Sequence, residues 1–263
     1  MSTVLECHGL TAGYDGVPVV RDVELSVEPG EVVAVLGPNG AGKTTTLLAL
    51  SGVIRTLSGT VVACGKPVRG GRSYLAARRG LAFVPDDRSL FFNLTGRQNL
   101  RLALSRKEVH SGIAQVLDYF PALERVLDRR AGLMSGGEQQ MLALGRALAA
   151  KPAVLMVDEM SLGLAPIIVQ RLMPTIRRMA SELGTGILLV EQHVDLALDV
   201  ADRAYVLDRG TISITGKASE LRESRDLLRA SYMGELAYER LSQNGNANGN
   251  GNAAGASGGL GNG

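Results

Sequence analysis

The chain has 263 residues, which suits one or two domains, and 45% of them are hydrophobic, as in an ordinary globular protein. Its 28 lysines and arginines nearly balance its 26 acidic residues, so the composition gives no basic footprint for nucleic acid. Cys7 and Cys64 form neither a disulfide framework nor a metal-ligand spacing, which indicates a reducing, cytosolic compartment.

The first half of the chain reads as strands followed by a helix. Short β segments are predicted at Val4–Glu6 and Val19–Val27, on either side of a glycine-rich turn. Residues Glu31–Leu36 form a nearly continuous apolar run, as expected of a strand buried on both faces of a parallel sheet. A glycine-rich loop and a helical pattern over Lys43–Val53 follow it. Further buried strands are predicted at Leu81–Val84, Val154–Val157, Ile187–Val190 and Ala204–Leu207.

Helical patterns separate most of these strands, which predicts an α/β fold. The expected architecture is a P-loop NTPase core with a mostly parallel sheet, an N-terminal antiparallel β region and an inserted helical subdomain at about residues 86–151. The subdomain should contain helices at Leu100–Leu104, Ile113–Phe120 and Glu138–Ala150. A last long helix is expected at Ile167–Leu183, opened by Pro166, closed by Gly184 and kinked or split by Pro174.

The end of the chain differs in composition from the rest. Asn244–Gly263 contains only Asn, Gly, Ala, Ser and one Leu, and it carries no charge. Such a stretch buries too little apolar surface to offset its ordering entropy. We therefore expect a folded domain over residues 1–241 and a disordered Asn/Gly-rich tail over 242–263.

The loop after the first buried strand predicts a phosphate site. It matches G-x-x-x-x-G-K-[ST] at every fixed position: Gly37, Pro38, Asn39, Gly40, Ala41, Gly42, Lys43 and Thr44. The glycines let the backbone wrap round phosphates, and the helix behind them presents its positive end to the anion. Lys43 supplies charge for the β- and γ-phosphates of ATP, the Thr44 hydroxyl can ligate Mg²⁺, and Thr45 completes the predicted site. A chance glycine turn is the alternative, and the flanking strand and helix argue against it.

A pair of carboxylates ends the apolar strand Val154–Val157. A strand of a doubly wound sheet delivers its carboxyl end to the ligand crevice. Asp158 is then expected to reach the hydration shell of Mg²⁺, and Glu159 to polarise the attacking water as a general base. An acidic pair after a strand is also common as a helix cap or a solvated turn, but the phosphate loop favours the functional interpretation.

The stretch Met134–Gln139 (MSGGEQ) resembles the signature motif of ABC-type ATPases, usually written L-S-G-G-Q. Ser135 and Glu138 are spaced as a capping box for the following helix, and the motif has that purely local explanation as an alternative. Yet Gly136 and Gly137 in a first helical turn cost about 1 kcal/mol each relative to alanine. Bare N–H groups at a helix start suit a phosphate. The resemblance implies that this motif closes over ATP held by the phosphate loop of an opposing subunit.

The resemblance covers about Val4–Leu241. Within the family, the chain is most similar to the shorter ATPase subunit of branched-chain amino-acid importers. The stretches that carry it are Leu133–Ala147, Ser161–Pro166, Leu188–Gln192 and the run YVLDRG from Tyr205 to Gly210. It implies a Mg-dependent ATPase that works as a homo- or heterodimer. It also implies membrane-spanning permease subunits, an external solute-binding protein, and a peripheral place on the cytoplasmic side of the cell membrane.

Further positions follow from the resemblance alone. Tyr14 corresponds to the aromatic residue that stacks on adenine, and otherwise reads as a core or turn tyrosine. Asp86 stands where most relatives carry a glutamine that senses Mg²⁺. Gln192 falls at the switch position that contacts the γ-phosphate, often a histidine, and His193 follows it; an exposed residue opening the helix Val194–Val200 is the alternative for His193.

Two departures from the family pattern bear on turnover. Met160 stands where relatives have proline and frees the backbone beside Glu159, and Leu164 replaces a common aspartate. With Asp86 and Gln192 they raise the alternative of a nearly inactive nucleotide-binding partner. Glu159 and Lys43 are intact, so hydrolysis is expected.

A soluble, non-transport ATPase in translation or DNA repair is a second alternative. Such proteins usually carry two ATPase cores or a long coiled coil, and this chain has one set of motifs. The sequence shows no apolar run long enough to span a membrane and no secretory signal. A role in transport therefore requires a partner that holds the protein at the membrane. Phe91 and Phe92 are the predicted contact with that partner, unless they belong to the core.

Overall fold

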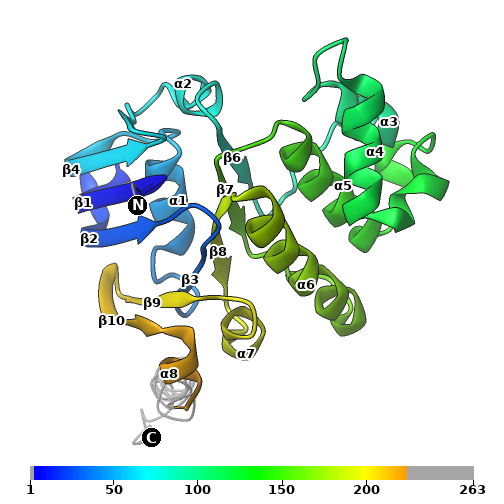
Figure 1. The fold of residues 1–263 in the computed structure, drawn as a ribbon. Helices are drawn as coiled ribbons and strands as arrows, with labels where there is room; N and C mark the ends of the chain where they lie inside the picture. The colour runs from blue at the N-terminus through cyan, green and yellow to red at the C-terminus, as the bar shows by residue number, and fades with distance from the viewer. Residues whose placement is uncertain (1–2, 224–263) are drawn as a thin grey trace, which may run out of the picture. The chain divides into compact units, whose positions relative to one another are not determined.

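The computed structural model describes residues 3–223, and a six-stranded sheet forms the centre of this part (Figure 1). The strand order is β10-β9-β3-β8-β7-β6, and every pair is parallel except β10 with β9. The strands are β3 (Val32–Leu36), β6 (Leu81–Val84), β7 (Val154–Asp158), β8 (Gly186–Glu191), β9 (Arg203–Asp208) and β10 (Thr211–Lys217). The predicted α/β core is confirmed. The predicted tail, 242–263, and the predicted domain end at 241 lie outside the described residues.

A second, antiparallel sheet comes from the N-terminal part of the chain, as predicted. Its order is β2-β1-β4-β5, with β1 (Leu5–Tyr14), β2 (Val17–Val27), β4 (Thr56–Ala63) and β5 (Lys66–Pro67). The strands β1 and β2 are longer than predicted, because shifts in their pairing register let them continue through the glycine-containing stretch. Strand β4 was not predicted, because its first five residues are not buried and show no apolar alternation.

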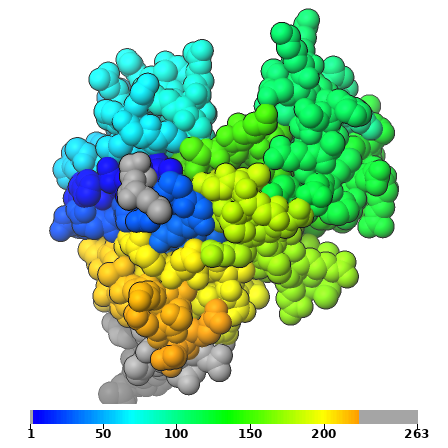
Figure 2. Space-filling model, in the orientation of Figure 1, coloured from blue at the N-terminus to red at the C-terminus, as the bar shows by residue number. Residues whose placement is uncertain are grey.

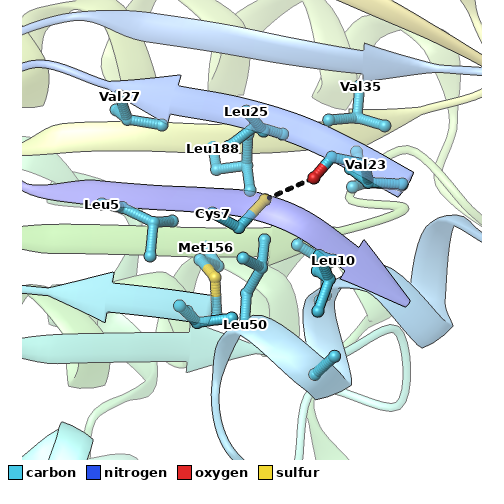
Figure 3. Close-up of a cluster of buried hydrophobic side chains, with 14 of the residues drawn as sticks. Leu5, Cys7, Leu10, Val23, Leu25, Val27, Val35, Leu50, Met156 and Leu188 are labelled. Carbon is cyan, nitrogen blue, oxygen red and sulfur yellow. Dashed lines mark hydrogen bonds between the residues drawn. The ribbon is translucent and has the colours of Figure 1, made fainter. Parts of the chain in front are cut away.

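The hydrophobic core lies between the two sheets and includes one face of α1 (Lys43–Leu50). Figure 3 shows side chains from the antiparallel strands facing residues of the central sheet and of this helix. Among them are Cys7, Leu25, Leu50, Met156 and Leu188. The Cys7 thiol donates to the carbonyl of Val23 at 3.4 Å, and burial raises the pKa of that thiol to about 12. Cys7 therefore behaves as a core residue.

All named elements between β6 and β7 are helical. Figure 2 shows most of this segment, in green, gathered on the right of the view, with a hollow between it and the cyan residues. Its elements are α3 (Gly96–Arg101), α4 (Val109–Tyr119), η1 (Pro121–Val126), η2 (Ala131–Leu133) and α5 (Gly136–Ala149). The predicted helix at Leu100–Leu104 is displaced, because a Thr95–Gln98 capping box starts α3 earlier. The remaining helices are α2 (Ser73–Ala77), α6 (Pro166–Leu183), α7 (Val194–Leu198) and α8 (Ala218–Glu223).

The long helix α6 runs without a break from Pro166 to Leu183. The predicted split at Pro174 is wrong. Buried residues stand on both sides of the proline, Leu172 and Met173 before it and Ile176 after it, and their packing outweighs the lost hydrogen bond. Gly184 ends the helix in the left-handed conformation, with φ of 67°, as predicted.

Candidate nucleotide site

The predicted site residues follow the carboxyl ends of neighbouring parallel strands. Leu36 at the end of β3 pairs with Glu191 at the end of β8, and Asp158 at the end of β7 pairs with Val190. Parallel strands present their carboxyl ends at one edge of a sheet. The phosphate loop, Asp158, Glu159 and Gln192 therefore meet at a single edge, although they are distant in sequence.

The phosphate loop has a backbone shape that requires glycine at defined positions. Gly42, at the start of α1, has φ of 103°, and a Cβ on Gly37 would lie 2.3 Å from the carbonyl oxygen of Leu207. The turn after β9 supports the loop from beneath, because the Gly210 amide donates to the Ala41 carbonyl at 3.0 Å. Asn39, Gly40 and Thr44 are exposed at the mouth of the loop, while Thr45 is buried and Pro38 is half-buried.

Lys43 points back over the loop. Its side chain is only 3% exposed, and Nζ donates to the carbonyls of Gly37 and Pro38 at 2.9 Å each. The same atom lies 3.6 Å from Oε1 of Glu159. Burial lowers the pKa of Lys43, and Glu159 opposes that shift. A buried ammonium group held by neutral carbonyls and one carboxylate is well placed to bind an anion in the loop.

Asp158 is a buried carboxylate with no hydrogen bond from the described residues to either oxygen. Burial raises its pKa to about 6, and the neighbouring Thr44 side chain counters part of this effect without making a bond of full geometry. An unpartnered buried carboxylate is costly unless another group uses it. Because it lies beside the exposed hydroxyl of Thr44, its surroundings suit a divalent cation.

Asp86 follows β6 after a single proline and is exposed. It lies near enough to Asp158 to contribute to the raised pKa of that residue. Within residues 3–223, no group of three or more His, Cys, Asp and Glu side chains is arranged to hold a metal ion. A metal here would therefore take most of its ligands from phosphate oxygens and water. That pattern is typical of Mg²⁺, which keeps several waters and binds one or two protein oxygens.

Glu159 stands in a strained conformation just after β7. Its φ is 42°, and its amide donates to the carbonyl of Val190 at 3.0 Å. Non-glycine residues with positive φ are uncommon and gather at functional sites. Its carboxylate faces Lys43 and is half-buried, so it is accessible from the edge of the sheet.

Gln192 and His193 follow the end of β8, which lies between the phosphate loop strand and the Asp158 strand. Gln192 is half-buried, whereas His193 is exposed and takes the N-cap position of α7 without a side-chain capping bond. His193 still lies close enough to the buried Glu191 to lower its pKa. The structure places both predicted residues at the correct edge of the sheet and gives Gln192 the more enclosed position.

Tyr14 ends strand β1 at the turn into β2 and is 48% exposed. It pairs with Val17 across the turn Asp15-Gly16. An exposed ring beside a hairpin turn has room for a planar partner, which a core tyrosine would not have. The core alternative for Tyr14 is therefore wrong.

The predicted signature residues start helix α5. Ser135 caps it, with its hydroxyl accepting from the Glu138 amide at 3.3 Å and its amide donating to Glu138 Oε2 at 2.8 Å. These bonds lower the pKa of Glu138, and Arg129 lies 3.7 Å from its carboxylate. The capping alternative is thus part of the answer. Among the described residues, no hydrogen bond or ion pair joins 135–138 to the phosphate loop of the same chain.

Capping does not account for Gly136. A Cβ there would meet nothing closer than 3.5 Å, so the fold of this chain leaves room for a larger residue. Gly137 is tighter, since a Cβ would lie 3.0 Å from Ile168. Glycine at a helix start without a steric or conformational need costs stability. An open backbone at Gly136 is instead suited to a ligand that approaches the helix end.

Hydrogen bonds that were not predicted join the loop after Asp86 to the signature helix α5. Arg88 donates to Gln140 Oε1 at 2.9 Å and to Gln139 Oε1 at 3.0 Å. Arg146 of the same helix donates to the carbonyl of Ser89 at 2.7 Å. Nothing in the local sequence pattern marks Arg88 as a tether. Glu191 was also missed, although a single acid at the end of an apolar strand is a signal of its own.

Comparison with known proteins agrees with this geometry. The model of the ABC transporter family matches residues 20–161. The chain is 40% identical over 224 residues to the high-affinity branched-chain amino acid transport ATP-binding protein BraG of Pseudomonas aeruginosa, covering 84% of this chain and 95% of the relative. It is 37% identical to a probable branched-chain amino acid transport ATP-binding protein, LivF, of Archaeoglobus fulgidus, covering 81% and 92%.

More distant relatives serve other systems. The lipopolysaccharide export system ATP-binding protein LptB of Escherichia coli is 32% identical, with 88% of this chain and 97% of the relative covered. A solved ATP-binding subunit of an ABC transporter superposes with a TM-score of 0.76 at 29% identity, covering 88% of this chain and 99% of that one. None of the helices described here is long and apolar enough to cross a membrane.

Proposed function

Because the chain belongs to the family of ABC transporter ATP-binding proteins, we propose that it is the Mg-dependent ATP-hydrolysing subunit of an importer for branched-chain or related amino acids. The single observation that carries hydrolysis is the meeting of Lys43, Asp158 and Glu159 at one edge of the sheet. There a buried cation and an unpartnered carboxylate lie beside a strained glutamate.

The chain's own residues divide the work. The amides of residues 37–44 and the Nζ of Lys43 bind the β- and γ-phosphates, and Lys43 exchanges its bonds to Gly37 and Pro38 for phosphate oxygens. Thr44 and Asp158 would hold Mg²⁺, and Asp86 lies near Asp158. Such an ion would supply positive charge against the charge that develops on the phosphates. Glu159 orients a water molecule and takes its proton, and Gln192 donates a hydrogen bond toward the γ-phosphate.

The signature residues act on the opposing subunit. The capping bonds of α5 use the amides of Ser135 and Glu138, so the amides of Gly136 and Gly137 are left for a phosphate held by a second copy or a related ATPase. Two such subunits would enclose two ATP molecules, closing when phosphate contacts form from both sides and opening after hydrolysis. A solved cassette of the same fold, 23% identical, is a dimer bound to ADP and phosphate.

ATP turnover by the wild type and by Glu159→Gln tests the hydrolytic part. Glu159→Gln is expected to bind ATP, to accumulate as an ATP-bound dimer and to turn over at least about tenfold more slowly, the scale expected for the loss of a general base. Glu108→Gln is the matched control, since Glu108 is a surface residue paired with Lys151. Equal rates in the wild type and Glu159→Gln would remove Glu159 from the mechanism.

The importer part is supported by the branched-chain relatives, which are 37% to 40% identical, whereas the lipopolysaccharide export relative is matched over a similar share of its length at 32% identity. Co-purification with the full chain should recover membrane-spanning permease subunits encoded with a solute-binding protein. Deletion of the chain should abolish uptake of labelled leucine, isoleucine or valine, and the wild type but not Glu159→Gln should restore it. Intact uptake combined with a defect in export would refute the assignment to import.

A further inference from the structure

The turn that carries Glu159 is fixed to the end of β8 at both of its ends. At one end the Glu159 amide donates to the carbonyl of Val190 at 3.0 Å. At the other end Ser161 makes two bonds to the Glu191 carboxylate, from its amide to Oε1 at 3.0 Å and from its hydroxyl to Oε2 at 2.6 Å. Both oxygens of Glu191 are thereby used on a single residue. The turn between Glu159 and Ser161 has little freedom to move relative to β8.

Glu191 is an unusual residue for this contact, because glutamate is rarely fully buried. Its side chain is fully buried, and Ser161 is only 8% exposed. Burial raises the pKa of Glu191, and among residues 3–223 no lysine or arginine forms an ion pair with it. Burying a carboxyl group costs free energy unless its hydrogen bonds are satisfied. An apolar side chain would pack at the end of β8 without this cost. The contribution of the carboxylate is therefore its pair of hydrogen bonds from Ser161.

The backbone of this turn requires hydrogen bonds that hold it in place. Glu159 has a φ of 42°, a conformation that a non-glycine residue keeps only when its surroundings hold it. Met160 has no ring to restrict its own backbone, and its side chain is fully buried under the turn. Without the bonds of Ser161, the Glu159 amide would be the one hydrogen bond described here that joins this turn to β8, because the other backbone bond of Glu159, from the Leu162 amide to its carbonyl at 3.0 Å, stays within the turn. A general base must be held close to one geometry to be effective.

We infer that Glu191 is a positioning residue for Glu159, acting through Ser161, and that it ties the turn after β7 to the switch residue Gln192. This inference rests on the proposed hydrolysis of ATP. Glu191 directly precedes Gln192, so a movement of Gln192 toward the γ-phosphate is transmitted through the Glu191 carboxylate to Ser161. The exposed residues Leu162 and Gly163 follow Ser161, and they carry the same displacement to the surface of the subunit.

The sharpest test compares Ser161→Ala with Ser161→Thr. Alanine deletes only the hydroxyl that bonds to Glu191 at 2.6 Å, while threonine keeps it. Ser161→Ala is expected to lower kcat for ATP hydrolysis by about tenfold or more, since small misplacements of a catalytic group have effects of up to roughly a hundredfold. The KM for ATP should stay within about twofold, because the phosphate loop is untouched. Ser161→Thr should keep most of the wild-type kcat.

Glu191→Gln extends the test, because the glutamine keeps one acceptor oxygen and replaces the other with a donor. It should fall between the wild type and Ser161→Ala in kcat, again with little change in KM. Circular dichroism and ATP binding of each variant would identify any that fails to fold. Ser161→Ala carries the test in that case, since it removes a single oxygen atom.

A double variant separates positioning from general structural damage. If Glu191 and Ser161 act through Glu159, Ser161→Ala should cause no further loss in single-turnover hydrolysis once Glu159→Gln is present. A full additional loss in that background, or wild-type kcat in Ser161→Ala, would overturn the inference. A wild-type protein without ATP turnover, or one indifferent to Glu159→Gln, would instead refute the proposed function.

Discussion

The Nζ atom of Lys43 lies 3.6 Å from Oε1 of Glu159, and the same Nζ donates to the carbonyls of Gly37 and Pro38. The lysine comes from the first residue of α1 and the glutamate from the turn after β7. These three oxygen atoms of the protein surround the Lys43 ammonium group, which is the group that would bind the triphosphate. We therefore expect the approach of ATP to have two effects: the release of Lys43 from the loop carbonyls, and a weaker attraction between Lys43 and Glu159.

Lys43→Ala should bind ATP about tenfold to a hundredfold more weakly, the range for losing a hydrogen bond to a charged group. Lys151→Ala is the matched control, because Lys151 is exposed and pairs only with Glu108 in the described structure. Equilibrium titration with a fluorescent ATP analogue measures both. Unchanged affinity in Lys43→Ala would place the phosphates elsewhere.

Gly136→Asp should abolish ATP hydrolysis while leaving the fold intact. A Cβ at this position is tolerated, an aspartate lies at the favourable end of the helix dipole, and the Arg88 guanidinium is 3.7 Å from the position that the Cβ would take. Its negative charge would repel a phosphate approaching the start of α5. Turnover assays and thermal unfolding distinguish this prediction from simple capping, for which Gly136→Asp would remain active. Gly136→Ala tests size without charge and should be the milder change.

Asp158→Asn should stabilise the protein at pH 7 in the absence of nucleotide and with EDTA present. Burial raises the pKa of Asp158 from 3.8 to about 6, so the folded state binds its proton more tightly than the unfolded chain does. The free energy of unfolding of the wild type therefore falls as the pH rises from about 4 to about 6, and the loss is complete above that range. The two pKa values differ by an amount equivalent to about 3 kcal/mol.

Urea unfolding of the wild type and Asp158→Asn between pH 4 and pH 7.5 checks this prediction. The stability difference between them should be small near pH 4, where the carboxyl group is protonated in the folded state and still about half protonated in the unfolded chain, and largest near neutrality. A difference that does not change with pH would contradict it. With Mg-ATP the order should reverse, since the variant loses a carboxylate for the metal.

Tyr14→Ala should weaken ATP binding by roughly fivefold to a hundredfold, which corresponds to the 1–3 kcal/mol measured for base stacking on aromatic side chains. Tyr14→Phe keeps the ring and should bind ATP almost as the wild type does. Because stacking reads the face of a base and not its edge, GTP should lose affinity to a similar extent. A loss in Tyr14→Phe equal to that in Tyr14→Ala would show that the hydroxyl matters instead of the ring.

Photo-crosslinking from Phe92 should capture a membrane-spanning subunit in the assembled transporter. Phe91 and Phe92 are 54% and 51% exposed, so the core alternative for them is wrong. Both follow the Asp86 loop, which Arg88 and Arg146 tether to α5. Val17, 65% exposed on β2, is the matched control position and should give no such product. Equal crosslinking from Val17, or none from Phe92, would count against this surface.

Much of the fold was predictable because its elements carry strong local patterns. The apolar runs before Gly37, before Asp158 and before Gln192 are fully buried strands, as the near-continuous pattern predicted. The strand β4 was missed because it is mostly exposed. The split at Pro174 was predicted wrongly, because residues packed on both sides of the proline keep the helix continuous, while the alternative of a kink stays a prediction. The predicted boundary of a helix was wrong where a capping residue sets it, as Thr95 does for α3.

The amino-acid sequence by itself determined the chemistry: a phosphate loop, two carboxylates after a strand, and a glycine-rich helix start. The tertiary structure decided which of these groups meet. The sheet order β3-β8-β7-β6 brings Lys43 to Glu159 and sets Glu191 against Ser161. It also leaves room for a Cβ at Gly136, with no atom closer than 3.5 Å. The physical reason is that the periodicity of a segment indicates only the burial and conformation of that segment. Which strands become neighbours in the sheet depends on how segments that are distant in sequence pack together, and no local pattern encodes that packing.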